Sequence, residues 1–224
     1  MPTQRKLAAY VGPMLVFVVL LSVPPFFRHL GSQFWLRSPE YWIYPLQTIL
    51  CAVLLVHFWR EYEFHQVAKI WLIGVLGVLV FLLWISPQQF FGFPPRRDGF
   101  DPNVFAGQGL LYWPTITLRL VRLVVVVPLV EEIFWRGFLL RYLINERFET
   151  VPFGTFSWTS FAVVAGLFGF SHAPPDWIAA VITGAIYNIV AYQTKSLLAC
   201  VLTHAITNLL LGIWILQTQQ WGFW

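Results

Sequence analysis

The stretch LVVVVPLVEEIFWRGFLL, from Leu123 to Leu140, places two adjacent glutamates, Glu131 and Glu132, inside a run of apolar residues. An acidic side chain at the centre of a bilayer costs about 2.5–3.5 kcal/mol on insertion scales, so such residues are usually functional or paired. Two neighbouring carboxylates also repel each other, which requires that at least one be protonated or paired. The stretch therefore predicts a membrane helix that carries functional or paired charge.

The composition of the chain predicts a polytopic membrane protein. Of the 224 residues, 58% are hydrophobic and 11% are charged, against about 45–50% and 25% in ordinary soluble domains. The twelve Trp and eight Tyr suit a protein that crosses two water–lipid boundaries. The net charge of +4 is dispersed along the chain, so no nucleic-acid partner is expected. Cys51 and Cys200 lie in apolar runs without a CxxC pattern and are interpreted as packing residues.

The apolar runs predict an all-α bundle of transmembrane helices, because only helices satisfy the backbone of such segments in lipid. Each span needs about 20 mostly apolar residues. Pro128 would divide the longest run, so we expect seven or eight spans, with a polar cavity in the C-terminal half. The candidate spans are Ala8–Phe27, Tyr41–Trp59, Ile70–Ile85, Ile116–Ile144, Phe156–Phe170, Trp177–Tyr192 and Leu197–Leu216.

A loop rich in proline and charge, Ser86–Pro114, is predicted between the third span and the rest. We therefore expect a single membrane domain over residues 1–224. Its leading spans and loop occupy residues 1–114, and its catalytic core occupies residues 115–224. With seven spans, the N-terminus is predicted to be cytoplasmic, because the loops on its side then hold more Lys and Arg.

Arg136 is the predicted partner of one of the two glutamates. It follows Glu132 by four residues, so the two lie on one helix face about 6 Å apart along the axis. Glu131 points about 100° away around the helix and is free to face another group. The alternative is a buried ion triad of all three residues that only fixes helix packing.

Two histidines and an asparagine complete the candidate site. His172 ends an apolar span, and His204 lies within another, with Asn208 four residues further on the same face. Taken alone, either histidine would more often bind a neighbouring helix than take part in a reaction. Together with Glu131, however, they fit amide hydrolysis, because a carboxylate and a His can deprotonate water while a His and an Asn stabilise an oxyanion. Zinc held by Glu131, His172 and His204 is a further alternative, although HExxH spacing is absent.

Three motifs, in this order, resemble the signatures of the CAAX protease and bacteriocin-processing family. Glu131–Arg136 resembles its EExxxR motif, Phe168–His172 its FxxxH motif and His204–Asn208 its HxxxN motif. The C-terminal half also resembles a CAAX prenyl protease-related branch that accompanies bacterial exosortase systems.

The resemblance implies a type II CAAX prenyl endopeptidase-like enzyme of the glutamate class in the bacterial inner membrane. Its substrate would be a membrane-tethered peptide or protein C-terminus, and no cofactor is expected. By the resemblance, Glu131 and His172 would activate water, His204 and Asn208 would form the oxyanion hole, and the Glu132–Arg136 pair would support Glu131.

Two other classes of function stay open from the sequence. One is a non-catalytic sorting or immunity factor of the same fold, in which the polar cluster would be closed and both glutamates paired. The other is a proton-coupled transporter, since chains of intramembrane Glu and His also relay protons. Transporters usually contain internal repeats, and none is visible in this sequence. The sequence does not indicate an oligomeric state.

Overall fold

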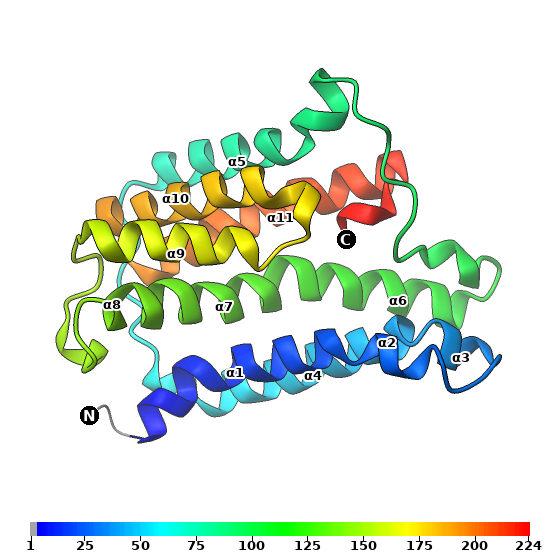
Figure 1. The fold of residues 1–224 in the computed structure, drawn as a ribbon, viewed down its shortest axis with the longest axis horizontal. Helices are drawn as coiled ribbons and strands as arrows, with labels where there is room; N and C mark the ends of the chain where they lie inside the picture. The colour runs from blue at the N-terminus through cyan, green and yellow to red at the C-terminus, as the bar shows by residue number, and fades with distance from the viewer. Residues whose placement is uncertain (1–3) are drawn as a thin grey trace.

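The structure is a computed structural model that describes residues 4–224, and these residues form a helical bundle without strands. Seven long helical segments of the described chain lie roughly along one direction (Figure 1). The predicted all-α class is confirmed. The long segments are α1 (Gln4–Ser22) continued by α2 (Pro24–Phe27), α4 (Glu40–His57), α5 (Ile70–Phe90), residues 109–142, α9 (Trp158–Phe170), α10 (Trp177–Thr194) and α11 (Leu197–Thr218).

The segment that carries the two glutamates is one continuous helical run. It lies between α1 and α4 on one side and α5, α9, α10 and α11 on the other (Figure 1). Its parts are α6 (Gly109–Val121), η3 (Arg122–Val126), α7 (Val127–Glu132), η4 (Ile133–Leu139) and α8 (Leu140–Tyr142).

Pro128 does not divide this helix, so the structure has seven long segments rather than eight. Proline lacks a backbone N–H and crowds the carbonyl four residues earlier. Here the π-helical turn η3 lies directly before α7. Its backbone hydrogen bonds span five residues instead of four, so the helix continues although Pro128 makes no such bond. A second π-helical segment, η4, follows the glutamates. The glutamate pair is therefore flanked on both sides by π-helical backbone, which is frequent at functional sites.

Other prolines inside the helices are tolerated because side chains bind the carbonyls that they leave free. Pro13 in α1 leaves the carbonyl of Ala9 without its helical donor, and Tyr62 donates its hydroxyl to that oxygen at 3.1 Å. Pro87 in α5 likewise leaves the carbonyl of Leu83 without its helical donor, and that oxygen accepts from Ser86 Oγ at 2.8 Å. Such partners allow helices with internal proline to remain in lipid.

The loop between α5 and α6 is shorter than predicted at both ends. Sequence analysis places a loop over Ser86–Pro114, whereas α5 continues to Phe90 and α6 begins at Gly109. The proline at each end is accommodated within a helix instead of ending it. The division expected at residue 114 thus falls inside α6, and as a functional boundary it stays a prediction.

Three segments are by themselves long and apolar enough to cross a membrane, namely Gln4–Phe27, Ile70–Phe90 and Leu197–Thr218. Helix α9 is apolar but shorter. The central helical run carries buried charged side chains, including Glu132 and Arg136. Large apolar side chains are exposed along the outer faces, with Val56 74% and Ile70 73% exposed. Exposed apolar surface on this scale suits contact with lipid.

Candidate active site

Glu132 is completely buried and accepts two hydrogen bonds on one oxygen. Its Oε1 accepts from Arg136 Nη1 at 3.1 Å and from His204 Nδ1 at 2.9 Å. The predicted Glu132–Arg136 ion pair is therefore present. The hydrogen bond to His204 was not predicted, and it joins the central helix to α11 across the core.

Arg136 connects Glu132 to two further helices. The guanidinium is fully buried, donates from Nε to Asn188 Oδ1 at 3.1 Å and donates from Nη2 to the carbonyl of Gly184 at 3.0 Å. Asn188 in turn donates to the carbonyl of Phe161 in α9 at 3.1 Å. This fork of donors matches the geometry that arginine, and not lysine, can satisfy. The position of Glu132 is thus set by α9 and α10 as well as by its own helix.

His204 is oriented by the residues on both sides of its ring. Its ring lies 5.0 Å from that of Tyr187, whose hydroxyl donates to Thr207 Oγ1 at 3.0 Å. Oε1 of Glu132 is ion-paired with Arg136, and a carboxylate only accepts hydrogen bonds. Nδ1 of His204 therefore carries a proton, and Nε2 is the nitrogen left for other chemistry.

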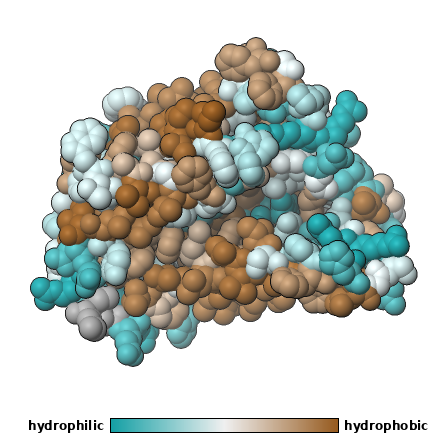
Figure 2. Space-filling view, viewed as in Figure 1, coloured by the Kyte–Doolittle hydropathy of each residue, from teal (hydrophilic) through white to brown (hydrophobic). Residues whose placement is uncertain are grey.

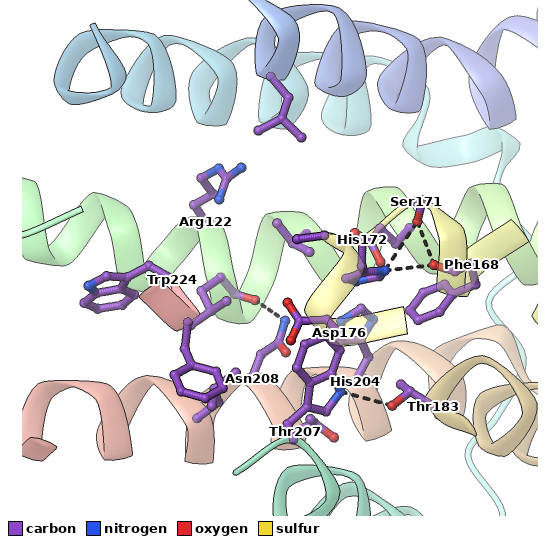
Figure 3. A pocket seen from close by; sticks show the side chains of 18 of the residues that line it. Arg122, Phe168, Ser171, His172, Asp176, Thr183, His204, Thr207, Asn208 and Trp224 are labelled. Atoms are coloured by element: carbon purple, nitrogen blue, oxygen red, sulfur yellow. Dashed lines mark hydrogen bonds between the residues drawn. The ribbon is translucent and has the colours of Figure 1, made fainter. Parts of the chain in front are cut away.

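Glu131 lies apart from this ion pair and lines a cavity of about 370 Å³. Its Oε2 has no hydrogen-bond partner among residues 4–224. The same cavity is lined by His172, His204 and Asn208, so all four residues predicted to surround the scissile bond share one space. Figure 2 shows a hollow near the middle of this face of the molecule, and Figure 3 shows the labelled side chains that surround the cavity. The predicted difference between the two glutamates is therefore present in the structure.

His172 follows the end of α9 and has a defined tautomer. Its Nδ1 lies 2.8 Å from the carbonyl of Phe168, one turn earlier (Figure 3). Because a carbonyl oxygen only accepts, Nδ1 must carry the proton, and Nε2 of the neutral ring keeps its lone pair. Packing against the tilted rings of Phe168 and Trp84, whose centroids lie 4.9 and 5.4 Å away, also restricts the imidazole. His172 can therefore act as a base at Nε2.

Asn208 uses one of its two amide hydrogens to hold the central helix. Its Nδ2 donates to the carbonyl of Leu123 in η3 at 2.8 Å. That carbonyl lies in the π-helical turn, where the regular helical donors are displaced. The amide group has a second hydrogen, which is available to an acceptor in the cavity.

The zinc alternative is not supported by this geometry. Across residues 4–224, no group of three or more His, Cys, Asp or Glu side chains is arranged to hold a metal ion. Glu131, His172 and His204 line the same cavity but do not converge as a ligand set. General acid–base chemistry by the side chains themselves fits the arrangement better.

Several residues of the site were missed from the sequence. Asn188 and Tyr187 lie in the predicted span Trp177–Tyr192. A search for polar side chains inside apolar spans, which singled out Glu131, could also have found Asn188. Asp176 and Arg122 also line the cavity. Asp176 forms an ion pair with Arg96 at 2.5 Å, and both residues line the cavity. No sequence signal links these two residues, because they are eighty positions apart.

Comparison with known families matches the part of the chain that carries this site. Residues 112–210 match the family of type II CAAX prenyl endopeptidase Rce1-like proteins. The family predicted from the three motifs is confirmed over this segment, which includes all six predicted site residues. Comparisons with curated proteins and with solved structures give no significant match.

The match supports a general role for this chain as a peptidase of the Rce1-like kind. Together with the apolar helices, it supports an integral membrane protein. It does not extend to the first 111 residues, which include α1, α4 and α5. Even so, α1 and α5 take part in the site, because Phe17, Leu21 and Trp84 line the cavity.

Proposed function

We propose that this protein is an intramembrane endopeptidase of the glutamate class, which cleaves a membrane-tethered peptide or protein C-terminus. The observation that carries the proposal is the unpaired carboxylate of Glu131 in the cavity that also contains His172, His204 and Asn208. A carboxylate held only for packing would be expected in an ion pair, as Glu132 is.

In the first step, Glu131 removes a proton from a water molecule that also donates a hydrogen bond to His172 Nε2, and the water oxygen attacks the carbonyl carbon of the scissile amide. The oxygen of the resulting tetrahedral intermediate accepts hydrogen bonds from His204 Nε2–H and from the free amide hydrogen of Asn208. This donation requires a proton on His204 Nε2 as well as on Nδ1, which donates to Glu132 Oε1. The proton taken from water then passes to the leaving nitrogen as the C–N bond breaks.

This geometry bears on the two other classes of function. A sorting or immunity factor would need no space beside Glu131, yet a cavity of about 370 Å³ lies there. A proton-coupled transporter would need a relay through the membrane, whereas Glu132 is bound to Arg136 and His204 and does not line the cavity. Hydrolysis is therefore the function that these contacts favour.

The test is cleavage by the purified protein in proteoliposomes, with an acyl-anchored, dye-labelled peptide library as substrate and mass spectrometry of the products. Glu131→Gln should reduce cleavage by at least about 100-fold, the scale expected for loss of a general base. The matched control is Glu146→Gln, which changes an exposed loop glutamate in the same way. Full activity in the Glu131→Gln protein would refute the mechanism.

We also propose that the protein lies in a bacterial inner membrane with its N-terminus in the cytoplasm. Seven segments place more basic residues on the N-terminal side than on the other, which favours this orientation. The N-terminal side holds Arg5, Lys6, Arg60, Lys69, Arg141, Arg147 and Lys195, and the opposite side holds Arg28, Arg37, Arg96 and Arg97. Single cysteines at the two ends can be tested with a membrane-impermeant maleimide, since both native cysteines are buried.

A further inference from the structure

A second cavity, also of about 370 Å³, lies at the end of the bundle where α4 begins. Among the described residues, neither Glu131 nor any histidine lines it, so it is not the candidate active site. Figure 2 shows hydrophilic surface at this end of the bundle, on the right of the view. The charged residues of its wall are Arg28, Glu40, Asp98 and Arg119.

Arg119 is a buried cation in this wall whose N–H donors lack acceptors. It is 5% exposed, and its Nε and Nη1 have no hydrogen-bond partner among residues 4–224. Its guanidinium carbon lies 4.7 Å from the ring centre of Tyr44 and 4.9 Å from that of Phe100. No Asp or Glu of the described chain forms an ion pair with it. The aromatic faces attract the charge, but they leave buried donors unsatisfied, which is costly.

Arg122 adds to this cost, because it is a second buried cation three residues later on the same side of the helix. Its guanidinium carbon lies 4.8 Å from the ring centre of Tyr44, so one tyrosine ring contacts both arginines. Arg122 donates to Gln47 Oε1 at 2.8 Å, whereas Nε and Nη1 of Arg119 have no such acceptor. An anion bound in the second cavity would therefore satisfy donors of Arg119 and reduce the repulsion between the two cations.

The other charges of the wall leave one carboxylate free. Arg28 and Glu40 form an ion pair with each other at 3.3 Å. Asp98 is exposed and forms no ion pair with any residue of the described chain. The wall thus presents one unpaired cation, Arg119, and one unpaired anion, Asp98. A ligand with one anionic and one cationic group would complement both.

The second cavity lies at the depth expected for phospholipid headgroups. Tyr44 follows Glu40, the first residue of α4, by four residues, so Arg119 contacts α4 about 6 Å from the end of that helix. Trp and Tyr side chains gather at the same end, as is typical of a water–lipid boundary. They include Trp35, Tyr41, Tyr44, Trp221 and Trp224.

We propose that this cavity binds a phosphoethanolamine group, with its phosphate on Arg119 and its ammonium on Asp98. Arginine suits the phosphate because its planar donors bind two phosphate oxygens at once, and a primary ammonium donates hydrogen bonds to a carboxylate. A volume of about 370 Å³ is within the usual range for small-molecule sites. The proposal does not depend on peptidase activity, since none of the proposed catalytic residues lines this cavity.

The test is native mass spectrometry of the purified protein in detergent, titrated with phosphatidylethanolamine or phosphatidylglycerol of identical acyl chains. Both lipids carry the phosphate, but only the first carries the ammonium. The wild-type dissociation constant for phosphatidylethanolamine should be at least about 10-fold lower, the scale of one charge-assisted hydrogen bond. Arg119→Gln should weaken binding of both lipids by about 10- to 100-fold. Asp98→Asn should remove the preference for phosphatidylethanolamine.

Arg37→Gln and Asp101→Asn are the matched controls. Arg37 is an exposed arginine of α3 (Phe34–Arg37) at the same end of the bundle (Figure 1), and Asp101 lies in the same loop as Asp98, but neither lines the cavity. Both variants should bind the two lipids as the wild type does. Because Asp98 is exposed, Asp98→Asn should fold normally and keeps the test decisive if Arg119→Gln does not fold. Equal wild-type affinities for the two lipids, or a preference that persists in Asp98→Asn, would overturn the proposal.

A soluble competitor identifies the source of the group. Displacement of the lipid by O-phosphoethanolamine, with the same dependence on Asp98, would support the proposal and show that a soluble phosphate ester fits the site. Asp98-dependent binding of phosphatidylethanolamine without such displacement would support the proposal and assign the site to the lipid. Inorganic phosphate that displaces the lipid as well as O-phosphoethanolamine does would indicate a site for any anion, and would overturn the role of Asp98.

Discussion

His204 Nδ1 lies 2.9 Å from Glu132 Oε1, the same oxygen that accepts from Arg136 Nη1 at 3.1 Å. Glu132, next to the proposed base, therefore has two roles. It neutralises the buried Arg136, and it sets the tautomer of His204 in the cavity. Glu131 has neither contact. The two neighbouring carboxylates should respond differently to the same substitution.

Glu132→Gln should destabilise the protein much more than Glu131→Gln does. Loss of the Glu132 charge leaves Arg136 buried without a counterion, and breaking one side of a buried pair typically costs about 3–5 kcal/mol. Glu131 has no ion pair among the described residues, so the isosteric amide should change the free energy of unfolding little. Thermal unfolding in detergent measures the stability of both variants. Equal losses of stability would contradict the different roles assigned to Glu131 and Glu132.

His172→Ala should reduce peptide cleavage by about 100- to 10,000-fold, the usual contribution of a general base or acid, while the melting temperature stays near that of the wild type. His172 follows the end of α9 and is only partly buried, so its ring contributes little to the core. His29, an exposed histidine that does not line the cavity, provides the control, because His29→Ala should leave cleavage near that of the wild type. Normal cleavage by His172→Ala would exclude the imidazole from the reaction.

Glu63, in the loop before α5, should make the stability of the fold depend on pH in the acidic range. Burial alone would raise the pKa of Glu63, but Lys6 at 2.6 Å and Arg141 at 3.2 Å outweigh burial and lower the pKa of this carboxyl below its usual value. A lowered pKa stabilises the fold at pH values above the unfolded carboxyl pKa of about 4.3. This contribution is lost as the pH falls through the folded-state pKa.

The melting temperature of Glu63→Gln should therefore be lower than that of the wild type at pH 7, and the difference should shrink towards zero near pH 3. Glu146→Gln, in an exposed loop, should show little difference at either pH. A difference for Glu63→Gln that stays constant with pH would mean that packing, and not charge, accounts for it.

Gly169 allows α9 and α10 to approach closely beside the site. A Cβ at this position would lie 3.0 Å from the backbone nitrogen of Val181 and 3.1 Å from its Cα, and closer still to its side chain. Gly169→Ala should lower stability by about 1–3 kcal/mol through overpacking. Gly166, three residues earlier in the same helix, has open space at that position, so Gly166→Ala should be neutral or stabilising. Equal melting temperatures of the two variants would contradict this contact.

The sequence by itself determined the features that depend on local spacing. Apolar runs predicted each long helix, because a chain in lipid must satisfy its own backbone. The four-residue spacing of Glu132 and Arg136 predicted their ion pair, since residues at that separation share a helix face. The same geometry separated Glu131 from the pair. Sequence also predicted the residues that line the cavity from three helices, through motifs that resemble a family later matched over residues 112–210.

Only the tertiary structure decided the contacts that depend on how each helix is rotated against its neighbours. The bond from His204 to Glu132 spans 72 positions, and the clamp of Arg136 on Gly184 and Asn188 spans 48 and 52. Local spacing carries no information on contacts between residues so far apart in the sequence. Nor does it show that a π-helical turn would keep the helix continuous past Pro128, or that Arg122 would line the same cavity as Glu131. Helix periodicity gives the face on which a side chain lies, whereas its partner depends on packing between helices far apart in the sequence.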